Sequence, residues 1–207
     1  METVSTFGIV GTGIIGAGWA ARALASGLDV LAYDPGADAK AHLEKKLRQI
    51  WPVLERTGLH PNASMERLTF CESVEAVAEQ AQFIQESAPE RMDLKCELLQ
   101  RVSQSARPGV VIASSSSGLL PSQLQEDCAN PARILVGHPF NPVYLLPLVE
   151  IVGGEQTSEH AVATAEAFYS AIGIHPLHVR NQIEGYISDR LQEALWREAL
   201  HLVNDGL

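Results

Sequence analysis

The chain has 207 residues, of which 46% are hydrophobic and 19% are charged. At roughly 150 residues per domain, this length predicts one domain and part of a second, with a hydrophobic core large enough to fold without disulfides. The 15 Lys and Arg residues against 25 Asp and Glu leave a net charge of −10. This balance argues against nucleic acid or an anionic membrane surface as a partner, because both attract clustered positive charge.

The cysteines and the short apolar runs favour a reducing compartment inside the cell. Cys71, Cys96 and Cys128 lie far apart and lack the spacing of a zinc site, and an odd, sparse set fits a reducing compartment. No apolar run approaches the roughly 18 residues that span a bilayer. The N-terminal sequence METVSTFGIVG lacks the charged and apolar regions of a signal peptide. We therefore expect a soluble cytoplasmic protein that holds no metal.

Short β-branched runs alternate with longer amphipathic stretches from one end of the chain to the other. In chain order we expect a strand at 7–11, a helix at 14–27, a strand at 29–34, a helix at 38–57, a strand at 67–71, a helix at 73–80 opened by Ser73, a strand at 82–87, a helix at 91–106, a strand at 109–116, a short helix from Pro121, strands at 134–140 and 148–154, a helix at 158–173, a strand at 174–179 and a long helix at 185–205. Pro52 predicts a break or kink near Trp51.

This alternation predicts an α/β fold, a doubly wound Rossmann-type sheet that is mainly parallel and covered by helices on both faces. One boundary is expected, at residues 180–185, after which the last helix begins a second unit.

A glycine-rich sequence, Gly11-Thr12-Gly13-Ile14-Ile15-Gly16, joins the first expected strand to the first expected helix. In this G-x-G-x-x-G pattern Gly11 permits a sharp turn, Gly13 lets a pyrophosphate approach the backbone, and Gly16 lets helix and strand pack closely. The helix N-terminus adds free N–H groups and a partial positive charge. We expect these residues to bind the phosphates of a dinucleotide, although a glycine-rich turn also occurs in unrelated α/β proteins.

An acid at the end of the second strand strengthens this interpretation and indicates which dinucleotide binds. Asp34 lies 18 residues beyond Gly16, where a carboxylate accepts hydrogen bonds from the adenosine ribose. It would repel a 2′-phosphate, and residues 35–37 offer no arginine to receive one. Lys40 is the only nearby cation in the sequence. We therefore expect NAD rather than NADP as the cofactor. In the alternative interpretation Asp34 only caps a turn before Pro35.

A histidine and an acid stand 12 residues apart near the end of the sheet. His138 follows an apolar strand, at the carboxyl end where open α/β sheets bind their ligands. Glu150 is a charged residue within the apolar strand Leu148-Val149-Glu150-Ile151-Val152, and a buried acid needs a partner. Such a pair would orient the imidazole and stabilise its protonated form. From spacing alone, a structural histidine and an edge-strand glutamate are an equal alternative.

Several segments together resemble the 3-hydroxyacyl-CoA dehydrogenase family, from Phe7 to Gly206. They are GTGIIGAGWAARALASGLDVLAYDP, FIQESAPERMDLK, VIASSSSGLLPS, VGHPFNPVYLLPLVEIVGG and LQEALWREALHLVNDG. The HPFNP…LVE segment is specific to this wider family. QESAPER and VYLLPLVE are similar to its carnitine dehydrogenase branch, and gulonate dehydrogenases of the λ-crystallin type carry related versions.

The resemblance implies roles for individual residues. It implies that His138 is a general base paired with Glu150, and that Ser117 hydrogen-bonds the reacting substrate oxygen. Glu90 and Lys95 match positions near the nicotinamide end of NAD, and Asn141 matches a position that shapes the same pocket. As isolated residues, Ser117 would be a solvated loop serine, and Glu90 and Lys95 would be solvated or dipole-complementing charges at a helix start.

One residue departs from the family pattern. Asp189, in Gly185-Tyr186-Ile187-Ser188-Asp189-Arg190, stands where the acyl-CoA enzymes have an asparagine. A carboxylate there suits a cationic substrate, although an ion pair with Arg190 or Arg197 would explain it equally well. Tyr144, Phe140, Tyr186 and Trp196 could hold a quaternary ammonium group, although each is more often a core residue in such a position.

The resemblance also implies a domain organisation and a reaction. Residues 1–182 would form the NAD-binding domain, and residues 183–207 would begin a helical substrate and dimerisation domain whose remainder is absent from this chain. The full-length form would be a homodimer that oxidises the 3-hydroxyl of L-carnitine with NAD. The alternatives are a 3-hydroxyacyl-CoA or sugar-acid substrate, or a non-catalytic, crystallin-like NAD-binding protein.

Overall fold

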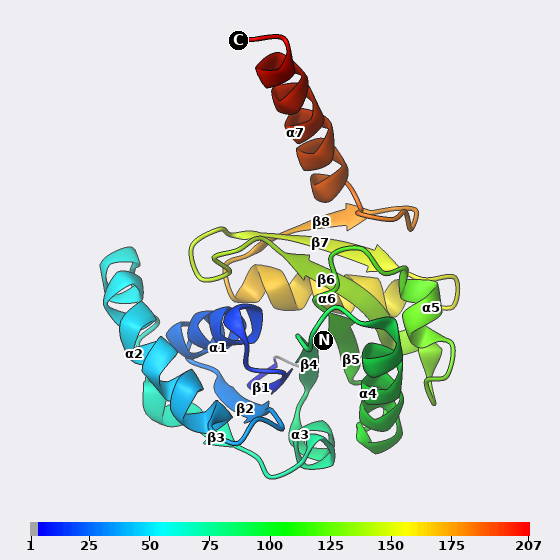
Figure 1. The fold of residues 1–207 in the computed structure, drawn as a ribbon. Coiled ribbons are helices and arrows are strands. Elements are labelled where there is room, and N and C mark those ends of the chain that lie inside the picture. The colour runs from blue at the N-terminus through cyan, green and yellow to red at the C-terminus, as the bar shows by residue number, and fades with distance from the viewer. Residues whose placement is uncertain (1–3) are drawn as a thin grey trace.

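Eight strands form one sheet in the computed structural model, which describes residues 4–207 (Figure 1). The order across the sheet is β3-β2-β1-β4-β5-β6-β7-β8. All neighbouring strands are parallel except β6 and β7. The strands are β1 (Thr6–Val10), β2 (Asp29–Tyr33), β3 (Leu68–Phe70), β4 (Phe83–Glu86), β5 (Val111–Ser114), β6 (Ile134–Pro139), β7 (Leu148–Gly153) and β8 (His175–Val179).

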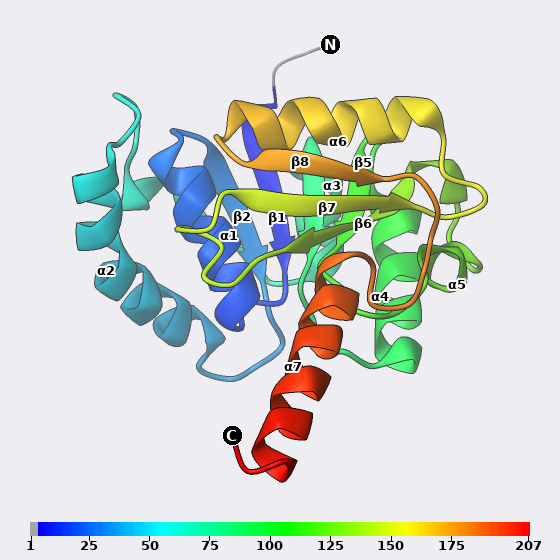
Figure 2. The same ribbon diagram turned by 90° about the horizontal axis from the view of Figure 1, so that it is seen from above.

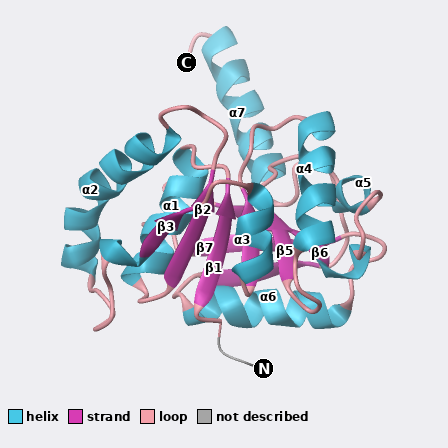
Figure 3. Ribbon diagram, turned by 90° about the horizontal axis from the view of Figure 1, so that it is seen from below, coloured by secondary structure: helices cyan, strands magenta, loops and turns pink. Residues whose placement is uncertain are grey.

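Helices cover both faces of this sheet, so the predicted doubly wound, mainly parallel fold is confirmed. One hydrophobic cluster joins the sheet to α1, α2 and α6, and a second joins it to α3, α4 and α5. Figure 3 shows the strands lying between these helices. The helices are α1 (Ile14–Ala25), α2 (Ala39–Thr57), α3 (Val74–Gln80), α4 (Met92–Ser105), α5 (Pro121–Gln125), α6 (Glu159–Ala171) and α7 (Ser188–Asn204), with 3₁₀ turns at Met65–Arg67 and Pro131–Arg133.

Local chemistry fixes several helix ends. Ser73 and Ser158 cap α3 and α6, because their hydroxyls accept hydrogen bonds from the backbone N–H groups three residues further on. Gly27 follows α1 with φ +82°, and a Cβ there would lie 2.6 Å from Nδ1 of His60. Only glycine fits this backbone conformation and this close approach.

Two helix predictions need correction. Helix α2 continues through Pro52 as one element of 19 residues, so of the predicted break or kink the break does not occur. Leu47 and Leu54 on either side of the proline are both buried in the same cluster, and this packing keeps the helix continuous while its ribbon bends (Figure 3). The last helix begins at Ser188 rather than at residue 185, because Gly185 and Tyr186 have φ values of +71° and +44°. Neither value is compatible with a right-handed helix.

Helix α7 projects from the domain in both Figures 1 and 2. None of its residues, 188–204, is buried. Large apolar side chains along it are exposed, namely Leu191, Leu195, Trp196, Leu200, Leu202 and Val203. The helix is therefore attached to the domain through its first turn and the residues just before it.

Candidate functional site

The glycine-rich loop joins β1 to α1 as expected, and its three glycines differ in what they contact. A Cβ on Gly16 would lie 1.9 Å from the carbonyl oxygen of Gly11, and a Cβ on Gly11 would lie 2.7 Å from the carbonyl oxygen of Ser87. A Cβ on Gly13 would meet nothing within 4 Å. The fold itself therefore requires Gly11 and Gly16. Gly13 faces open space, which fits a loop whose backbone receives a pyrophosphate.

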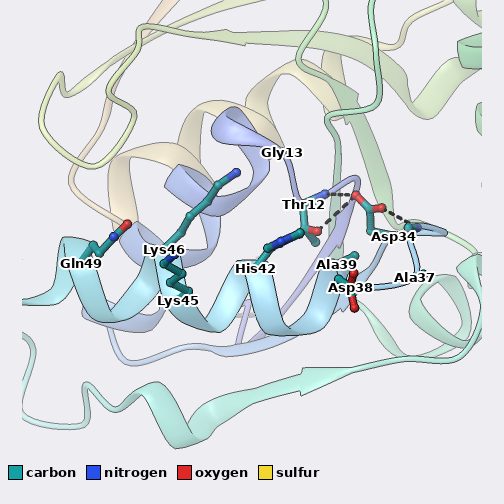
Figure 4. Close-up of a pocket in the computed structure, with 11 residues that line it drawn as sticks. Thr12, Gly13, Asp34, Ala37, Asp38, Ala39, His42, Lys45, Lys46 and Gln49 are labelled. Atoms are coloured by element: carbon teal, nitrogen blue, oxygen red, sulfur yellow. Dashed lines mark hydrogen bonds between the residues drawn. The ribbon is translucent and has the colours of Figure 1, made fainter.

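Asp34 connects this loop to the end of β2. Its Oδ2 accepts hydrogen bonds from the backbone nitrogen and the hydroxyl of Thr12, at 2.8 and 3.2 Å. Its Oδ1 accepts one from the backbone nitrogen of Gly36 at 2.9 Å (Figure 4). Asp34 therefore caps the turn before α2, as the alternative interpretation stated. A carboxylate can accept about four hydrogen bonds, so it retains capacity for a ribose hydroxyl.

A cavity of about 650 Å³ lies beside Asp34, between the glycine loop and α2. His42, Lys45, Lys46 and Gln49 project into it from one side of the helix (Figure 4). These four positions share a helical face because they are spaced by three, four and seven residues. Lys40 is not among the described residues that line the cavity, so the expectation of Lys40 as the nearby cation is corrected to Lys45 and Lys46.

His138 and Glu150 face each other across β6 and β7. They are direct partners in the antiparallel register, and Nδ1 of the imidazole lies 2.9 Å from Oε2 of the carboxylate. Glu150 is fully buried, and His138 is 9% exposed. β7 lies between β6 and β8, so Glu150 is not on an edge strand. The contact expected from the sequence is present, and the alternative position of Glu150 is excluded.

Glu150 accepts hydrogen bonds from three further donors at the start of α7. Its Oε1 accepts from the backbone nitrogens of Ile187 and Ser188, at 3.0 and 2.9 Å, and its Oε2 accepts from the Ser188 hydroxyl at 2.6 Å. Burial by itself would raise the pKa of Glu150, but the hydrogen bonds from His138 and Ser188 outweigh it and hold the pKa below its ordinary value. An ionised carboxylate on Nδ1 keeps the proton at that nitrogen and leaves Nε2 able to accept another.

A second cavity, of about 760 Å³, contains His138. The structure brings Glu150, Asn141 and Asp189, three of the residues expected at the substrate site, to this cavity, together with Ile15 of the glycine loop. Apolar side chains from several elements complete its wall, among them Phe140, Leu146, Leu148, Leu177, Ile187 and Leu191. The cavity is therefore mostly apolar, with a few polar groups near the imidazole.

The carboxylate of Asp189 interacts with the charges of His138 and Glu150. Burial and the negative charges of Glu150 and Glu90 raise the pKa of Asp189, while His138 acts in the opposite direction. Asp189 takes part in none of the ion pairs found within residues 4–207. The alternative explanation, a pair with Arg190 or Arg197, therefore has no support in the structure.

Of the four aromatic residues considered for a cationic group, Phe140 alone lines the His138 cavity among the described residues. Tyr186 is fully buried, and its hydroxyl donates to the carbonyl oxygen of Leu119 at 2.7 Å. Tyr144 packs, half-buried, against the core, and Trp196 is 63% exposed on α7. Tyr144 and Tyr186 are therefore core residues, and Trp196 is a surface residue.

The serine loop after β5 is held by Glu90. Its Oε1 accepts hydrogen bonds from the backbone nitrogens of Ser117 and Gly118, at 3.0 and 3.3 Å, and from the hydroxyl of Ser116. Burial tends to raise the pKa of Glu90, but the Ser116 hydroxyl and the charge of Lys95 lower it below its ordinary value. Ser117 itself is half-buried, and it is not among the described residues that line the His138 cavity.

Lys95 belongs to a buried ion pair that the sequence interpretation missed. Its Nζ donates to both carboxylate oxygens of Glu86, at 2.8 and 3.0 Å, and lies 3.5 Å from Oε2 of Glu90. Lys95 is 1% exposed and Glu86 is fully buried, so Lys95 is not a solvated charge. A signal for Glu86 was present, because it is a charged residue within an apolar strand, as Glu150 is.

Two kinds of feature are absent from the described residues. Within residues 4–207, no helix is long and apolar enough to cross a membrane. In the same range, no group of three or more His, Cys, Asp or Glu side chains is arranged to hold a metal ion.

The glycine loop, Asp34 at the end of β2 and the order of strands around β1 define a Rossmann-type dinucleotide-binding domain. Residues 6–183 match the family model described as 3-hydroxyacyl-CoA dehydrogenase, NAD binding domain. The chain belongs to this family, and NAD is its cofactor. The resemblance seen in the sequence is confirmed.

Comparison with individual proteins gives the same result. The chain is 56% identical over 204 residues to the L-carnitine dehydrogenase of Pseudomonas putida, covering 99% of the chain and 64% of that protein. It is 50% identical over 205 residues to the L-carnitine dehydrogenase of Streptomyces coelicolor, with the same coverage of 99% and 64%. The crystal structure of (S)-3-hydroxybutyryl-CoA dehydrogenase from Ralstonia eutropha matches with a TM-score of 0.89 at 26% identity, covering 99% of this chain and 73% of that one. The chain thus spans about 64% of the length of these curated relatives.

Proposed function

We propose that this chain carries the cofactor site and the proton-transfer pair of an NAD-dependent dehydrogenase that oxidises the 3-hydroxyl of L-carnitine to 3-dehydrocarnitine. The observation that carries the proposal is the 2.9 Å contact between His138 and Glu150 in a cavity that also contains Asp189. The names of the relatives at 50–56% identity support the choice of substrate.

The residues present fit the cofactor. Gly13 leaves open space at the phosphate loop, Ile14 and Ile15 begin the helix behind it, and Asp34 retains an acceptor for the ribose. Lys95 and Glu90 belong to the network that shapes the serine loop, and we place the nicotinamide end of NAD near them. When bound, NAD supplies the hydride acceptor.

His138 is the general base in this proposal. Its Nε2 accepts the proton of the substrate hydroxyl, while Nδ1 stays hydrogen-bonded to Glu150. The buried carboxylate holds the ring in place and stabilises the imidazolium. Proton transfer by a positioned side chain contributes roughly 10²–10⁴-fold to a rate. Ser117 is proposed to hydrogen-bond the reacting oxygen, and its backbone is fixed by Glu90.

The chemistry of the cavity favours a small cationic substrate. A quaternary ammonium group has no hydrogen to donate and is held by aromatic faces and negative charge. Phe140 and Asp189 offer these two features in the cavity that contains His138, and Asn141 adds a polar group. A 3-hydroxyacyl-CoA or a sugar acid is the alternative substrate. A non-catalytic NAD-binding protein would have no need of the buried His138–Glu150 pair.

The remaining expectations are part of the same proposal. Residues 1–182 form the NAD-binding domain, and 183–207 begin a helical domain. The exposed apolar side chains Leu191, Leu195 and Trp196 of α7 support a protein contact there, which we propose serves a homodimer of the full-length form. The free cysteines Cys71, Cys96 and Cys128 support a reducing compartment, the cytoplasm.

The test is NADH formation by the full-length protein with L-carnitine, 3-hydroxybutyryl-CoA and a 3-hydroxy acid that lacks the ammonium group. We expect the highest kcat/KM for L-carnitine. Asp189→Asn should lower kcat/KM for carnitine more than for the acid without an ammonium group, because only carnitine has a cation that loses an attraction. Activity confined to the CoA ester, or unchanged carnitine kinetics in the Asp189→Asn variant, would favour the alternative substrates.

A further inference from the structure

The first residue of α7 touches both oxygens of the Glu150 carboxylate. The hydroxyl of Ser188 donates to Oε2 at 2.6 Å, and its backbone nitrogen donates to Oε1 at 2.9 Å. Oε2 is the same oxygen that lies 2.9 Å from Nδ1 of His138. Ser188 and His138 therefore share one carboxylate oxygen.

Ser188 lies at the N-terminal end of α7, and the rest of this helix projects from the domain. Residues 188–204 contain no buried side chain, so the helix N-terminus is where α7 meets the buried carboxylate. The left-handed conformations of Gly185 and Tyr186, with φ values of +71° and +44°, turn the chain into this position. The Tyr186 hydroxyl fixes the turn by donating to the carbonyl oxygen of Leu119.

We propose that Ser188 is a positioning residue that acts through Glu150 and sets the pH at which His138 takes up a proton. Its role in the reaction rests on the proposed function, whereas its effect on the proton affinity of the imidazole can be measured without any substrate.

The direction of the effect follows from the shared oxygen. A hydrogen bond from Ser188 draws negative charge on Oε2 toward the hydroxyl and so weakens the hold of the carboxylate on an imidazolium. Without the hydroxyl, the buried carboxylate has fewer donors and interacts more strongly with protonated His138. The ring should then remain protonated to a higher pH, by about 0.5–1 unit for the loss of one such hydrogen bond.

The imidazole also has other charged and titratable neighbours. Asp189 on α7 and Glu90 before α4 add negative charge, and the Tyr186 ring lies 5.5 Å from the His138 ring. Burial and the neighbouring carboxylates raise the pKa of both Asp189 and Tyr186. Since Asp189 could titrate together with the pair, the comparison is repeated in the Asp189→Asn background.

The experiment is an NMR titration of the ligand-free protein with isotope-labelled histidine. His138→Gln identifies the His138 signal by its absence. Ser188→Ala should raise the protonation midpoint of His138 by about 0.5–1 pH unit. Ser188→Thr keeps a hydroxyl and should stay close to the wild type. Ser170→Ala, at an exposed serine of α6, is the surface control and should change nothing.

A second pair of variants covers the case in which Ser188→Ala does not fold. Threonine and valine have nearly the same shape, so Ser188→Thr and Ser188→Val differ chiefly in the hydroxyl. The midpoint should be higher in the valine variant. An unchanged or lowered midpoint in the alanine or valine variant, relative to the one with a hydroxyl, would overturn the proposal.

Kinetics then separate this inference from the proposed function. With an active full-length enzyme, the acid limb of the pH profile of kcat/KM for oxidation should move to higher pH in Ser188→Ala, by the same amount as the NMR midpoint. A purely structural role would lower the rate at every pH and leave the limb in place. If no 3-hydroxy substrate is oxidised but the midpoint moves, the proposed function fails and the role of Ser188 stands.

Discussion

The cofactor site and the His138 site belong to one sheet but are built from the chain in different ways. The glycine loop, α1 and Asp34 lie within one β-α-β unit, and Asp34 holds the loop through Thr12, 22 residues away. The His138 site combines β6, β7 and the start of α7, and Glu150 reaches Ser188 across 38 residues.

The two sites therefore depend on different parts of the chain. The glycine loop is held by the hydrogen bonds from Gly11 to the Tyr33 carbonyl and from Thr12 to Asp34, and it packs against the backbone of Ser87. The His138–Glu150 pair is complete only when the first turn of α7 supplies three of the hydrogen bonds to the carboxylate. The cofactor site should therefore tolerate changes in α7, and the His138 site should respond to them.

His138→Gln should separate the two sites most strongly. Loss of the proton acceptor should lower kcat for oxidation by about 10²–10⁴-fold. NADH affinity should stay close to the wild-type value, because the His138 side chain is hydrogen-bonded to Glu150 and not to the glycine loop. Steady-state kinetics measure kcat, and calorimetry measures the affinity for NADH. A comparable loss of NADH affinity would show that the sites are not independent.

Two glycine variants test whether the cofactor loop serves the fold or the ligand. A Cβ on Gly16 clashes with the Gly11 carbonyl oxygen at 1.9 Å, so Gly16→Ala should destabilise the domain by about 1–3 kcal/mol, as overpacking does. Gly13→Ala meets nothing within 4 Å. It should keep the wild-type melting temperature and lose NADH affinity instead. Thermal unfolding measures the stability of the two variants, and calorimetry measures their NADH affinity. An equal loss of stability in Gly13→Ala and Gly16→Ala would contradict these separate roles.

Asp34→Ala should reduce the preference for NAD over NADP. Hydrogen bonds to a charged group contribute about 1.5–3 kcal/mol, so NAD affinity should fall by roughly 10- to 150-fold, while NADP escapes a repulsion. The alanine variant also loses the contacts to Thr12 and Gly36. Asp34→Asn keeps an acceptor and removes the charge, so it isolates the repulsion. Equal affinity of the wild-type protein for NAD and NADP would contradict a role of Asp34 in choosing between them.

Glu90 offers a smaller effect that depends on pH. Its pKa in the folded protein lies below the ordinary value of 4.5, so the ionised form stabilises the fold above that value, and this contribution is lost as the pH falls. Glu90→Gln should therefore lower the melting temperature at neutral pH, and the difference from wild type should shrink as the pH falls below about 4.5. A difference that stays constant from neutral to acid pH would show that charge is not its cause.

The sequence predicted the order of elements and the glycine loop, and it marked His138 and Glu150 as a possible pair with an equal alternative. Each of these has a local signature: hydrophobic periodicity, glycines at fixed spacing, or a charge within an apolar strand. The same kind of signature marks Glu86, which the sequence interpretation passed over although it forms the buried pair with Lys95.

Only the tertiary structure decided the rest. Lys45 and Lys46, rather than Lys40, line the cavity beside Asp34 because the direction in which α2 lies selects one of its faces. The antiparallel direction of β7 and the contact of Ser188 with Glu150 join segments far apart in the chain. Such pairings depend on how whole elements pack, and no run of neighbouring residues records them.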